Sequence, residues 1–294
     1  MVEKFPRPLR DARAMIVEAF DSQPRRTFAV TSLLSFIDAH REAWSIKTYV
    51  STTTMVEFLL AETPLRKLRL ESQHYASLDR FSWGDPASPY ELALTLRQGS
   101  YLSHGTAVSL LGLTDEAPTF FYVNKEQSPK PVGSSLTQEG INRAFAAPQR
   151  KSRNIFRFRD WRFVLLNGKH TANLGVEQRR GMAGEPLLAT GLERTLIDIA
   201  VRPTYAGGVF KVLEAYRAAK AKVEPEALAA MLRELDYVYP YHQTIGFYLE
   251  RAGVSEVHLE PLRRLGISYE FFLAHGLSNT TVDSSWRLRI PTGI

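Results

Sequence analysis

Histidine and carboxylate side chains would have to carry any metal or acid–base chemistry, because the chain contains no cysteine. The seven histidines stand singly, without the HExxH or HxH spacing that directs two ligands to one metal. They are His40, His74, His104, His170, His242, His258 and His275. We interpret His104, before Gly105, as a buried or helix-start residue, and Glu193, Arg194 and Asp198 as a structural ion-pair group on one helix. We therefore expect no catalytic residue, no metal and no cofactor.

One short motif leaves an enzymatic alternative. Gly133-Ser134-Ser135 is similar to the Gly-Ser start of a nucleotidyltransferase motif. That chemistry needs two nearby carboxylates to hold Mg²⁺, but Glu139 is the only acidic residue between Ser135 and Arg159. The sequence also lacks a GxxxxGK[ST] loop, a GxGxxG turn and a GxSxG elbow. We therefore expect that the protein is not an enzyme, and a nucleotidyltransferase-like enzyme remains the alternative.

Most of the positive charge lies in one stretch of about thirty residues. The net charge is +6, and residues 151–180 hold eight Lys and Arg against two Asp and Glu. Arg157 and Arg159 alternate with Phe156 and Phe158, so in a strand both arginines point away from the face that buries the phenylalanines. Either this is a solvated hairpin with an Arg-rich outer face, or it is a contact surface for nucleic acid or for an acidic protein. The predicted surface consists of Arg153, Arg157, Arg159, Arg162 and Lys169.

Length and composition indicate two globular domains. The chain has 294 residues, of which 44% are hydrophobic and 23% charged, and about 150 residues per domain is the usual expectation. No apolar run approaches the length of a membrane span. The first ten residues lack the apolar core of a secretory signal. We expect a cytoplasmic protein without a membrane partner.

The first 85 residues alternate helices and strands in a recognisable order. Apolar spacing predicts helices at 9–22, 31–44 and 51–62, a short strand at 28–30, and a hairpin formed by 65–70 and 76–83. Residues 84–89, rich in Gly and Pro, form the clearest linker. The order is typical of a winged helix-turn-helix, so we predict a DNA-binding domain over residues 1–85.

The third predicted helix would enter the major groove. Burial of Met55, Phe58 and Leu59 against the other helices leaves the opposite face free for base edges and phosphates. The predicted wing tip would contact the DNA backbone. These 85 residues hold 12 Lys and Arg against 11 Asp and Glu, which is a low charge for a DNA-binding domain. The predicted DNA contacts are Lys47, Thr48, Ser51, Thr53 and Thr54 before and on the helix, and Gln73 and His74 at the wing tip.

Residues 90–294 are predicted to form a second, larger domain. Strand patterns at 119–123, 155–159 and 162–166 lie in its first half, and four helical patterns between 208 and 266 lie in its second half. The chain is therefore predicted to be α+β: an N-terminal winged helix-turn-helix followed by a larger α+β domain with a mixed sheet and C-terminal helices.

Three segments of this second domain resemble AbiEi-type antitoxins of bacterial type IV toxin–antitoxin systems, which act in abortive infection. Residues 101–114, YLSHGTAVSLLGLT, resemble the family's YLSHxSALxxxGLT segment. Residues 192–198, LERTLID, resemble its LERTLID segment. Residues 245–250, IGFYLE, are similar to its RLGYLLE helix, with Thr244-Ile245 where Arg-Leu is common. The resemblance covers roughly residues 90–270.

The resemblance implies a transcriptional repressor that is also an antitoxin. Its winged helix would bind inverted repeats in the promoter of its own operon, and its second domain would counteract a nucleotidyltransferase-like toxin encoded downstream. Antitoxins of this type need not form a stable complex with the toxin. With this resemblance, the basic surface would contact promoter DNA or, slightly favoured because the winged helix already provides a DNA-binding module, the toxin or the toxin's RNA substrate. The third helix does not match the family residue by residue, so no DNA contact is transferred from it. A stand-alone winged-helix transcription factor is the alternative.

Overall fold

The computed structural model describes residues 5–84, 88–129 and 136–294. Residues 85–87 of the linker and the Gly133–Ser135 motif lie outside these ranges. The chain divides into two compact units. We call them the N-terminal unit, residues 1–99, 154–163 and 179–187, and the C-terminal unit, residues 100–153, 164–178 and 188–294. The segments 154–163 and 179–187 are thus grouped with the N-terminal residues, whereas the sequence assigns them to the second domain.

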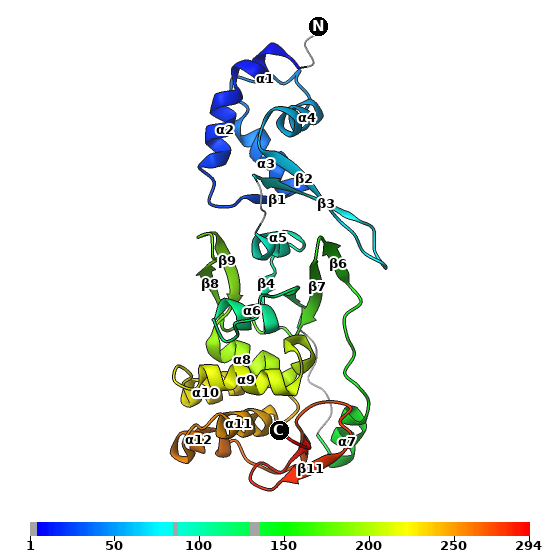
Figure 1. Cartoon of the computed structure of the whole chain (residues 1–294), viewed down its shortest axis with the longest axis vertical. Helices are drawn as coiled ribbons and strands as arrows, with labels where there is room; N and C mark the ends of the chain where they lie inside the picture. The colour runs from blue at the N-terminus through cyan, green and yellow to red at the C-terminus, as the bar shows by residue number, and fades with distance from the viewer. Residues whose placement is uncertain (1–4, 85–87, 130–135) are drawn as a thin grey trace. The chain divides into compact units, whose positions relative to one another are not determined.

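The N-terminal unit begins with helices and a short strand in nearly the predicted order. The predicted helix 9–22 is two helices, because Ala12 ends the first with ψ of −5° and its amide donates to the Pro8 and Arg10 carbonyls. The next two helices, Val30–His40 and Thr52–Glu62, lie beside a three-stranded sheet (Figure 1). The elements are α1 (Arg7–Asp11), α2 (Arg13–Asp21), β1 (Thr27–Ala29), α3 (Val30–His40), α4 (Thr52–Glu62), β2 (Leu65–Leu70), β3 (Leu78–Trp83) and α5 (Pro89–Thr95).

The predicted hairpin is present as β2 and β3. The two strands are antiparallel, with Leu65 opposite Trp83 and Leu70 opposite Leu78. Strand β1 pairs with the other edge of β3, which gives the order β1-β3-β2. Residues 71–77 connect the two strands of the hairpin.

Aromatic rings fill the core of the N-terminal unit. Phe20 on α2 stacks on Trp83 of β3, with ring centroids 4.3 Å apart, and the Phe5 ring meets Phe58 of α4 edge-on at 5.4 Å. Trp44 is also buried. Such large buried rings stabilise a small domain efficiently, because each removes a large apolar area from water. The helices and the sheet of this unit therefore share one core.

A six-stranded sheet contains both parallel and antiparallel pairs. Its order is β6-β7-β5-β4-β9-β8, and β4 is antiparallel to β5 but parallel to β9. This confirms the predicted mixed sheet and α+β class. The strands are β4 (Tyr101–Leu102), β5 (Phe120–Glu126), β6 (Ile155–Phe158), β7 (Trp161–Gly168), β8 (Val176–Arg180) and β9 (Pro186–Thr190).

Helices dominate the second half of the C-terminal unit, as predicted. In Figure 1 they form successive layers, with α8, α9 and α10 above α11 and α12. A three-stranded sheet of order β10-β12-β11 completes the unit. The elements are α6 (His104–Leu110), α7 (Gln138–Ala146), α8 (Leu192–Val201), the 3₁₀ turn Pro203–Ala206, α9 (Val209–Ala219), α10 (Pro225–Leu235), α11 (Tyr241–Arg251), α12 (Glu256–Arg263), β10 (Phe271–Phe272), β11 (Thr280–Asp283) and β12 (Leu288–Pro291).

The helical layers require a glycine at one close approach. A side chain at Gly246 of α11 would put its Cβ only 2.2 Å from the indole ring of Trp286. Trp286 is fully buried, and its indole N–H donates to the Glu250 carboxylate. Among the described residues, no helix is long and apolar enough to cross a bilayer.

Candidate functional site

Ser51 caps the N-terminus of helix α4 and holds its first turn in place. The Ser51 hydroxyl accepts a hydrogen bond from the Thr54 amide at 3.1 Å and contacts the Thr54 hydroxyl at 2.8 Å. Met55, Phe58 and Leu59 are buried, as the sequence predicts. Because these three anchors fix one face, the opposite face remains accessible to solvent.

The predicted contacts before and on α4 differ in their accessibility. Lys47, Thr48, Ser51 and Thr53 are exposed, whereas Thr54 is half-buried and its hydroxyl is part of the cap. Thr54 is therefore a helix-start residue more than a free recognition residue. Sequence reasoning missed Tyr49, whose side chain is 73% exposed in the same turn. Tyr49 could have been identified from the sequence, because it lies between Thr48, a predicted contact, and the apolar Val50.

Arg41 braces the turn that leads into α4, and sequence reasoning missed it. Its guanidinium donates to the Val50 carbonyl and to the Thr52 hydroxyl at 2.9 and 2.8 Å. It also pairs with Asp38 at 2.9 Å. These three contacts fix the connection between α3 and α4, so the exposed side chains of the turn stand on a rigid support.

The predicted wing-tip residues are accessible. Gln73 and His74 are exposed in the loop between β2 and β3, and Tyr75 beside them is 51% exposed. The base of this loop is held by strand β6, because Glu71 and Arg157 exchange two backbone hydrogen bonds of 2.9 and 2.7 Å. The Tyr75 ring lies 6.4 Å from the ring of Phe156.

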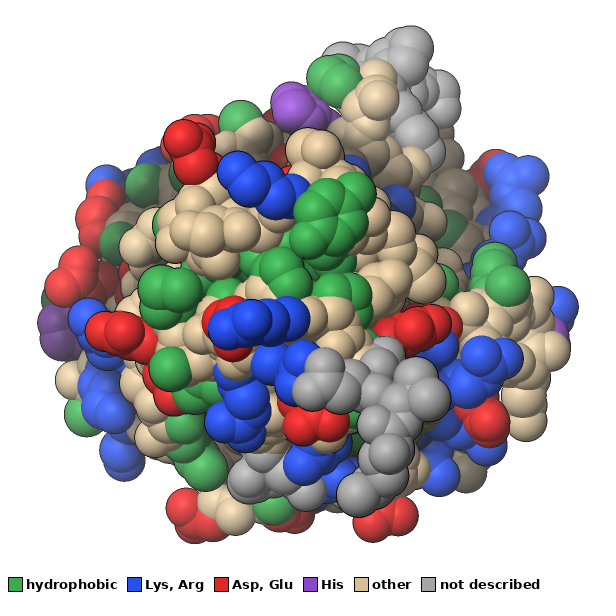
Figure 2. Space-filling model, turned by 90° about the horizontal axis from the view of Figure 1, so that it is seen from above, with side chains coloured by type: hydrophobic (Ala, Val, Ile, Leu, Met, Phe, Trp, Pro, Cys, Tyr) green, Lys and Arg blue, Asp and Glu red, His purple; other side chains and the backbone are tan. Residues whose placement is uncertain are grey.

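The face of the molecule in Figure 2 is not uniformly basic. Lys and Arg side chains are interspersed with Asp and Glu and with apolar groups. This pattern matches the nearly balanced charge of the first 85 residues. A polyanion bound here would be attracted by a few local cations and not by a broad positive field.

Three arginines of the predicted basic surface lie on the part of the β6–β7 hairpin, residues 154–163, that belongs to the N-terminal unit. Arg157 is exposed on β6 between Phe156, which is buried, and Phe158. Arg159 does not continue the strand, since it lies in the turn with φ of +52° and its guanidinium sits 5.2 Å from the Phe158 ring. The predicted alternation therefore ends at Phe158, where the chain reverses. Arg162 is half-buried.

The other two predicted cations belong to the C-terminal unit. Arg153 is exposed in an irregular segment. The Lys169 ammonium donates to the carbonyls of Leu235 and Asp236 at the end of α10 and lies 5.5 Å from the Tyr237 ring. A cation there satisfies terminal carbonyls and complements the helix dipole. Lys169 is thus a helix-capping residue, which its position in the sequence did not indicate.

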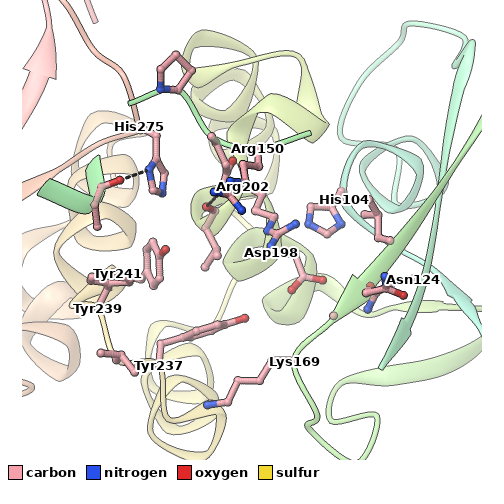
Figure 3. A pocket seen from close by; sticks show the side chains of 18 of the residues that line it. His104, Asn124, Arg150, Lys169, Asp198, Arg202, Tyr237, Tyr239, Tyr241 and His275 are labelled. Atoms are coloured by element: carbon pink, nitrogen blue, oxygen red, sulfur yellow. Dashed lines mark hydrogen bonds between the residues drawn. The ribbon is translucent and has the colours of Figure 1, made fainter. Parts of the chain in front are cut away.

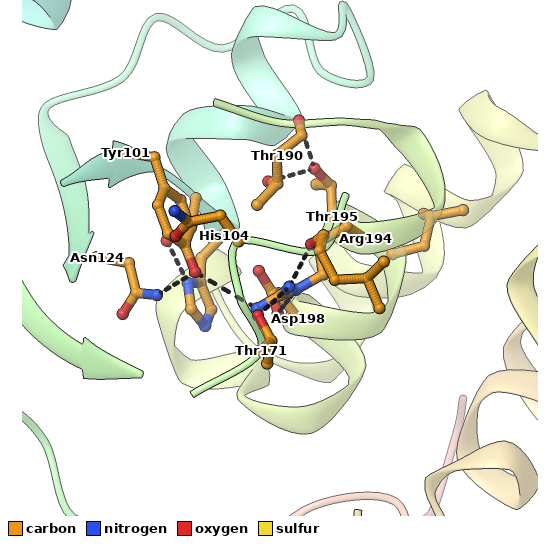
Figure 4. Close-up of polar contacts among 12 residues, drawn as sticks. Tyr101, His104, Asn124, Thr171, Thr190, Arg194, Thr195 and Asp198 are labelled. Atoms are coloured by element: carbon orange, nitrogen blue, oxygen red, sulfur yellow. Dashed lines mark hydrogen bonds and ion pairs between the residues drawn. The ribbon is translucent and has the colours of Figure 1, made fainter. Parts of the chain in front are cut away.

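A buried polar network joins two of the segments that carry the family resemblance (Figure 4). Arg194 and Asp198 form the predicted ion pair at 2.9 Å, with side chains only 4% and 7% exposed. Arg194 also donates to the Thr171 hydroxyl at 3.1 Å and to the Tyr101 hydroxyl at 3.4 Å. Tyr101 accepts a further bond from Asn124 at 2.7 Å. These contacts hold β4, β5 and α8 together.

Electrostatics keep this network charged. Burial lowers the pKa of Arg194, but the adjacent Asp198 carboxylate raises it, and the net direction is upward. An ion pair this deeply buried is costly to break from one side, because the remaining charge would be left without a partner. The network is therefore a structural element of the C-terminal unit.

His104 is buried in a backbone conformation that few residues adopt. Its φ is +51°, in the left-handed region, where histidine is one of the better tolerated residues. Its Nδ1 lies 2.8 Å from the Ser103 hydroxyl, and its ring meets Tyr205 edge-on at 5.4 Å. Burial lowers the pKa of His104 to about 4, so the imidazole is neutral near pH 7. This confirms the expected buried, helix-start histidine.

A cavity of about 660 Å³ opens beside His104 and lies wholly within the C-terminal unit (Figure 3). Four cationic side chains line it, against one carboxylate, Asp198. Three tyrosines and His275 form another part of its lining. No group of three His, Asp or Glu in the described ranges is arranged to hold a metal ion. The four cations are Arg150, Lys169, Arg194 and Arg202.

Comparison with known proteins supports the fold. No protein-family model matches the chain, and no curated protein matches it. The structure is similar to the crystal structure of the Rv2827c protein from Mycobacterium tuberculosis, with a TM-score of 0.60. The two chains are 13% identical, and the match covers 97% of this chain and 92% of the other. At that identity the likeness concerns the fold alone.

Proposed function

We propose that this protein is a DNA-binding transcriptional regulator, with α3, its turn and α4 as a helix-turn-helix and β2–β3 as the wing. The observation that carries the proposal is the exposure of Lys47, Thr48 and Thr53 at the start of α4, whose other face is anchored by buried side chains. In helix-turn-helix proteins, the first residues of the second helix contact base edges. Hydroxyl groups and a lysine suit mixed base and phosphate contacts.

The braced turn supports the same proposal. Arg41 ties the turn to α4, and Arg13 of α2 donates to the Glu62 carbonyl at the far end of that helix, at 2.8 Å. Both ends of α4 are therefore held by side chains from neighbouring helices. A rigidly positioned helix recognises DNA with little ordering cost on binding.

The resemblance to AbiEi-type antitoxins supports a more specific role. We propose that the regulator represses its own operon at inverted repeats and counteracts a nucleotidyltransferase-like toxin, without needing a stable complex. Two of the resembling segments meet in the Arg194–Asp198 network, so the resemblance concerns residues that build the C-terminal unit. In this proposal the chain is not an enzyme.

Gel shifts with the full-length chain test DNA binding. The DNA is the region upstream of its own gene, and a scrambled duplex is the competitor. Thr53→Ala should weaken specific binding by about 1–3 kcal/mol with little effect on the scrambled duplex, whereas Lys47→Ala should weaken both. Lys222→Ala, an exposed lysine of the C-terminal unit, is the matched control. If both interface variants bind like this control, the proposed interface is wrong.

Two further experiments separate the alternatives. Co-expression with the product of the adjacent downstream gene should restore growth that this product alone inhibits; a harmless product would favour a stand-alone transcription factor. Incubation of the purified chain with labelled nucleoside triphosphates and RNA should give no transfer product. Transfer of the label would establish the nucleotidyltransferase alternative.

A further inference from the structure

We propose that the cavity of the C-terminal unit is a binding site for a nucleoside phosphate. Its volume of about 660 Å³ lies within the range of about 300–1,000 Å³ that holds small ligands. All of its lining residues belong to the C-terminal unit. The proposal therefore stands independently of DNA binding by α4.

Two arginines of the cavity are available to an anion. Arg194 and Lys169 are already occupied by Asp198 and by the α10 carbonyls. Within the described ranges, by contrast, the guanidiniums of Arg150 and Arg202 make no hydrogen bond or ion pair. The Arg202 guanidinium lies over the face of the Tyr205 ring, 5.8 Å from its centroid. Guanidinium groups bind phosphate oxygens in a bidentate manner, so two of them on one cavity favour a phosphorylated ligand.

The aromatic side chains of the lining suit the nucleobase of such a ligand. Tyr237, Tyr239 and Tyr241 line the cavity together with His275 (Figure 3). The Tyr241 ring lies 5.4 Å from that of Tyr237 and 6.2 Å from that of Tyr239, so the three rings support one another. Ring faces of this kind stack on nucleobases with little base preference. One side of this wall packs against the protein, since Tyr239 stacks on Phe271 and His275 stacks on Phe145. An acidic peptide would satisfy the arginines but would leave the cavity side of the wall without an aromatic partner.

Polar groups on the remaining wall can orient a nucleoside. The Asp198 side chain is more than nine-tenths buried, and its Oδ2 accepts no hydrogen bond from the described residues, although Oδ1 pairs with Arg194. Such an acceptor suits a ribose hydroxyl or a base amino group. His104 lines the same cavity from its left-handed backbone position. Non-glycine residues in the left-handed region are found disproportionately at ligand sites.

Calorimetric titration of the full-length chain tests the proposal. The ligands are AMP and UMP, with ribose 5-phosphate and adenosine as matched probes that lack the base or the phosphate. We expect both nucleotides to bind, and both probes to bind at least about tenfold more weakly. A 5′-phosphorylated oligonucleotide that displaces AMP would show that the nucleotide is a strand end; failure to displace it would assign the site to a free nucleotide.

Variants of the cavity arginines test whether AMP binds in the cavity. Arg150→Gln and Arg202→Gln should each weaken AMP binding about tenfold or more, since each removes a charged partner of the phosphate. Arg217→Gln, an exposed arginine of α9 outside the cavity, should leave it unchanged. Arg150 is itself exposed, so its variant keeps the test valid if Arg202→Gln fails to fold. The proposal is overturned if neither nucleotide binds, if ribose 5-phosphate binds as tightly as AMP, or if Arg217→Gln matches the cavity variants.

Discussion

Single residues explain why the C-terminal unit tolerates so many buried polar groups. Asp198 and Tyr101 bond to the Arg194 guanidinium, and Asn124 donates to the Tyr101 hydroxyl, so hydrogen bonds offset the cost of burying these groups. His104 differs, because burial keeps it neutral instead of pairing it with a carboxylate. Its contribution to stability should therefore depend on pH.

Replacing His104 with asparagine should remove part of the acid sensitivity of the fold. In the folded chain its pKa is lowered from 6.5 to about 4, so between these values only the unfolded chain binds a proton at this site. Stability is then fully present above about pH 6.5 and falls as the pH approaches 4. Asparagine does not titrate and tolerates the left-handed region. From about pH 7 to about pH 4.5 the variant should lose about 2 kcal/mol less unfolding free energy than the natural chain.

Denaturant unfolding at the two pH values measures this difference. His258→Asn, at an exposed site on α12, is the control and should follow the natural chain. Parallel losses for all three proteins would show that His104 titrates normally in the folded state.

At the scale of the elements, the sequence predicts local structure but not the pairings between residues distant in the chain. The capped start of α4, the β2–β3 hairpin and the Arg194–Asp198 pair were predictable, because each depends on residues close in sequence. The bond between Glu71 and β6 and the capping of α10 by Lys169 join residues 86 and 66–67 positions apart. Local periodicity carries no information on such pairings. The cavity was missed for the same reason, since His104, Arg202 and Tyr241 meet only in the folded chain.

A methyl group at Gly246 should disrupt the packing of α11. Trp286 cannot retreat, because its ring is fully buried, bonded to Glu250 and covered by the Arg263 guanidinium at 4.2 Å. Gly246→Ala should therefore cost roughly 3 kcal/mol of unfolding free energy, the upper part of the range for overpacked cores, despite the better helix propensity of alanine. Thermal or denaturant unfolding measures it. The cost should shrink when Trp286 is also replaced by phenylalanine, and equal costs in both backgrounds would refute the contact.

At the scale of the whole molecule, the basic stretch is divided between two units. Arg157 belongs to the N-terminal unit with α4, whereas Arg153 belongs to the C-terminal unit. The sequence slightly favours a toxin or its RNA substrate as the partner of these cations. The grouping of β6 with the winged-helix candidate, and its bonds to the base of the β2–β3 loop, favour DNA for Arg157.

Reversing one charge at a time separates these partners. Arg157→Glu should weaken promoter binding and lower the log–log salt slope by about 0.9 for each phosphate that the variant no longer neutralises. Arg153→Glu, from the same stretch but the other unit, should leave promoter affinity and slope unchanged. Fluorescence anisotropy over a salt series measures both. If Arg157→Glu instead keeps promoter affinity and abolishes protection of cells expressing the downstream gene, its partner is the toxin or the toxin's RNA.

The central claim is that this chain recognises specific DNA through α4, and a DNase footprint of the full-length protein on the region upstream of its own gene tests it most directly. The account predicts two protected half-sites arranged as an inverted repeat. It also predicts that Thr53→Ala removes the protection while Lys222→Ala preserves it. The account would be contradicted by a uniform cleavage pattern at all protein concentrations below those at which nonspecific binding protects the whole fragment, or by an unchanged footprint for Thr53→Ala.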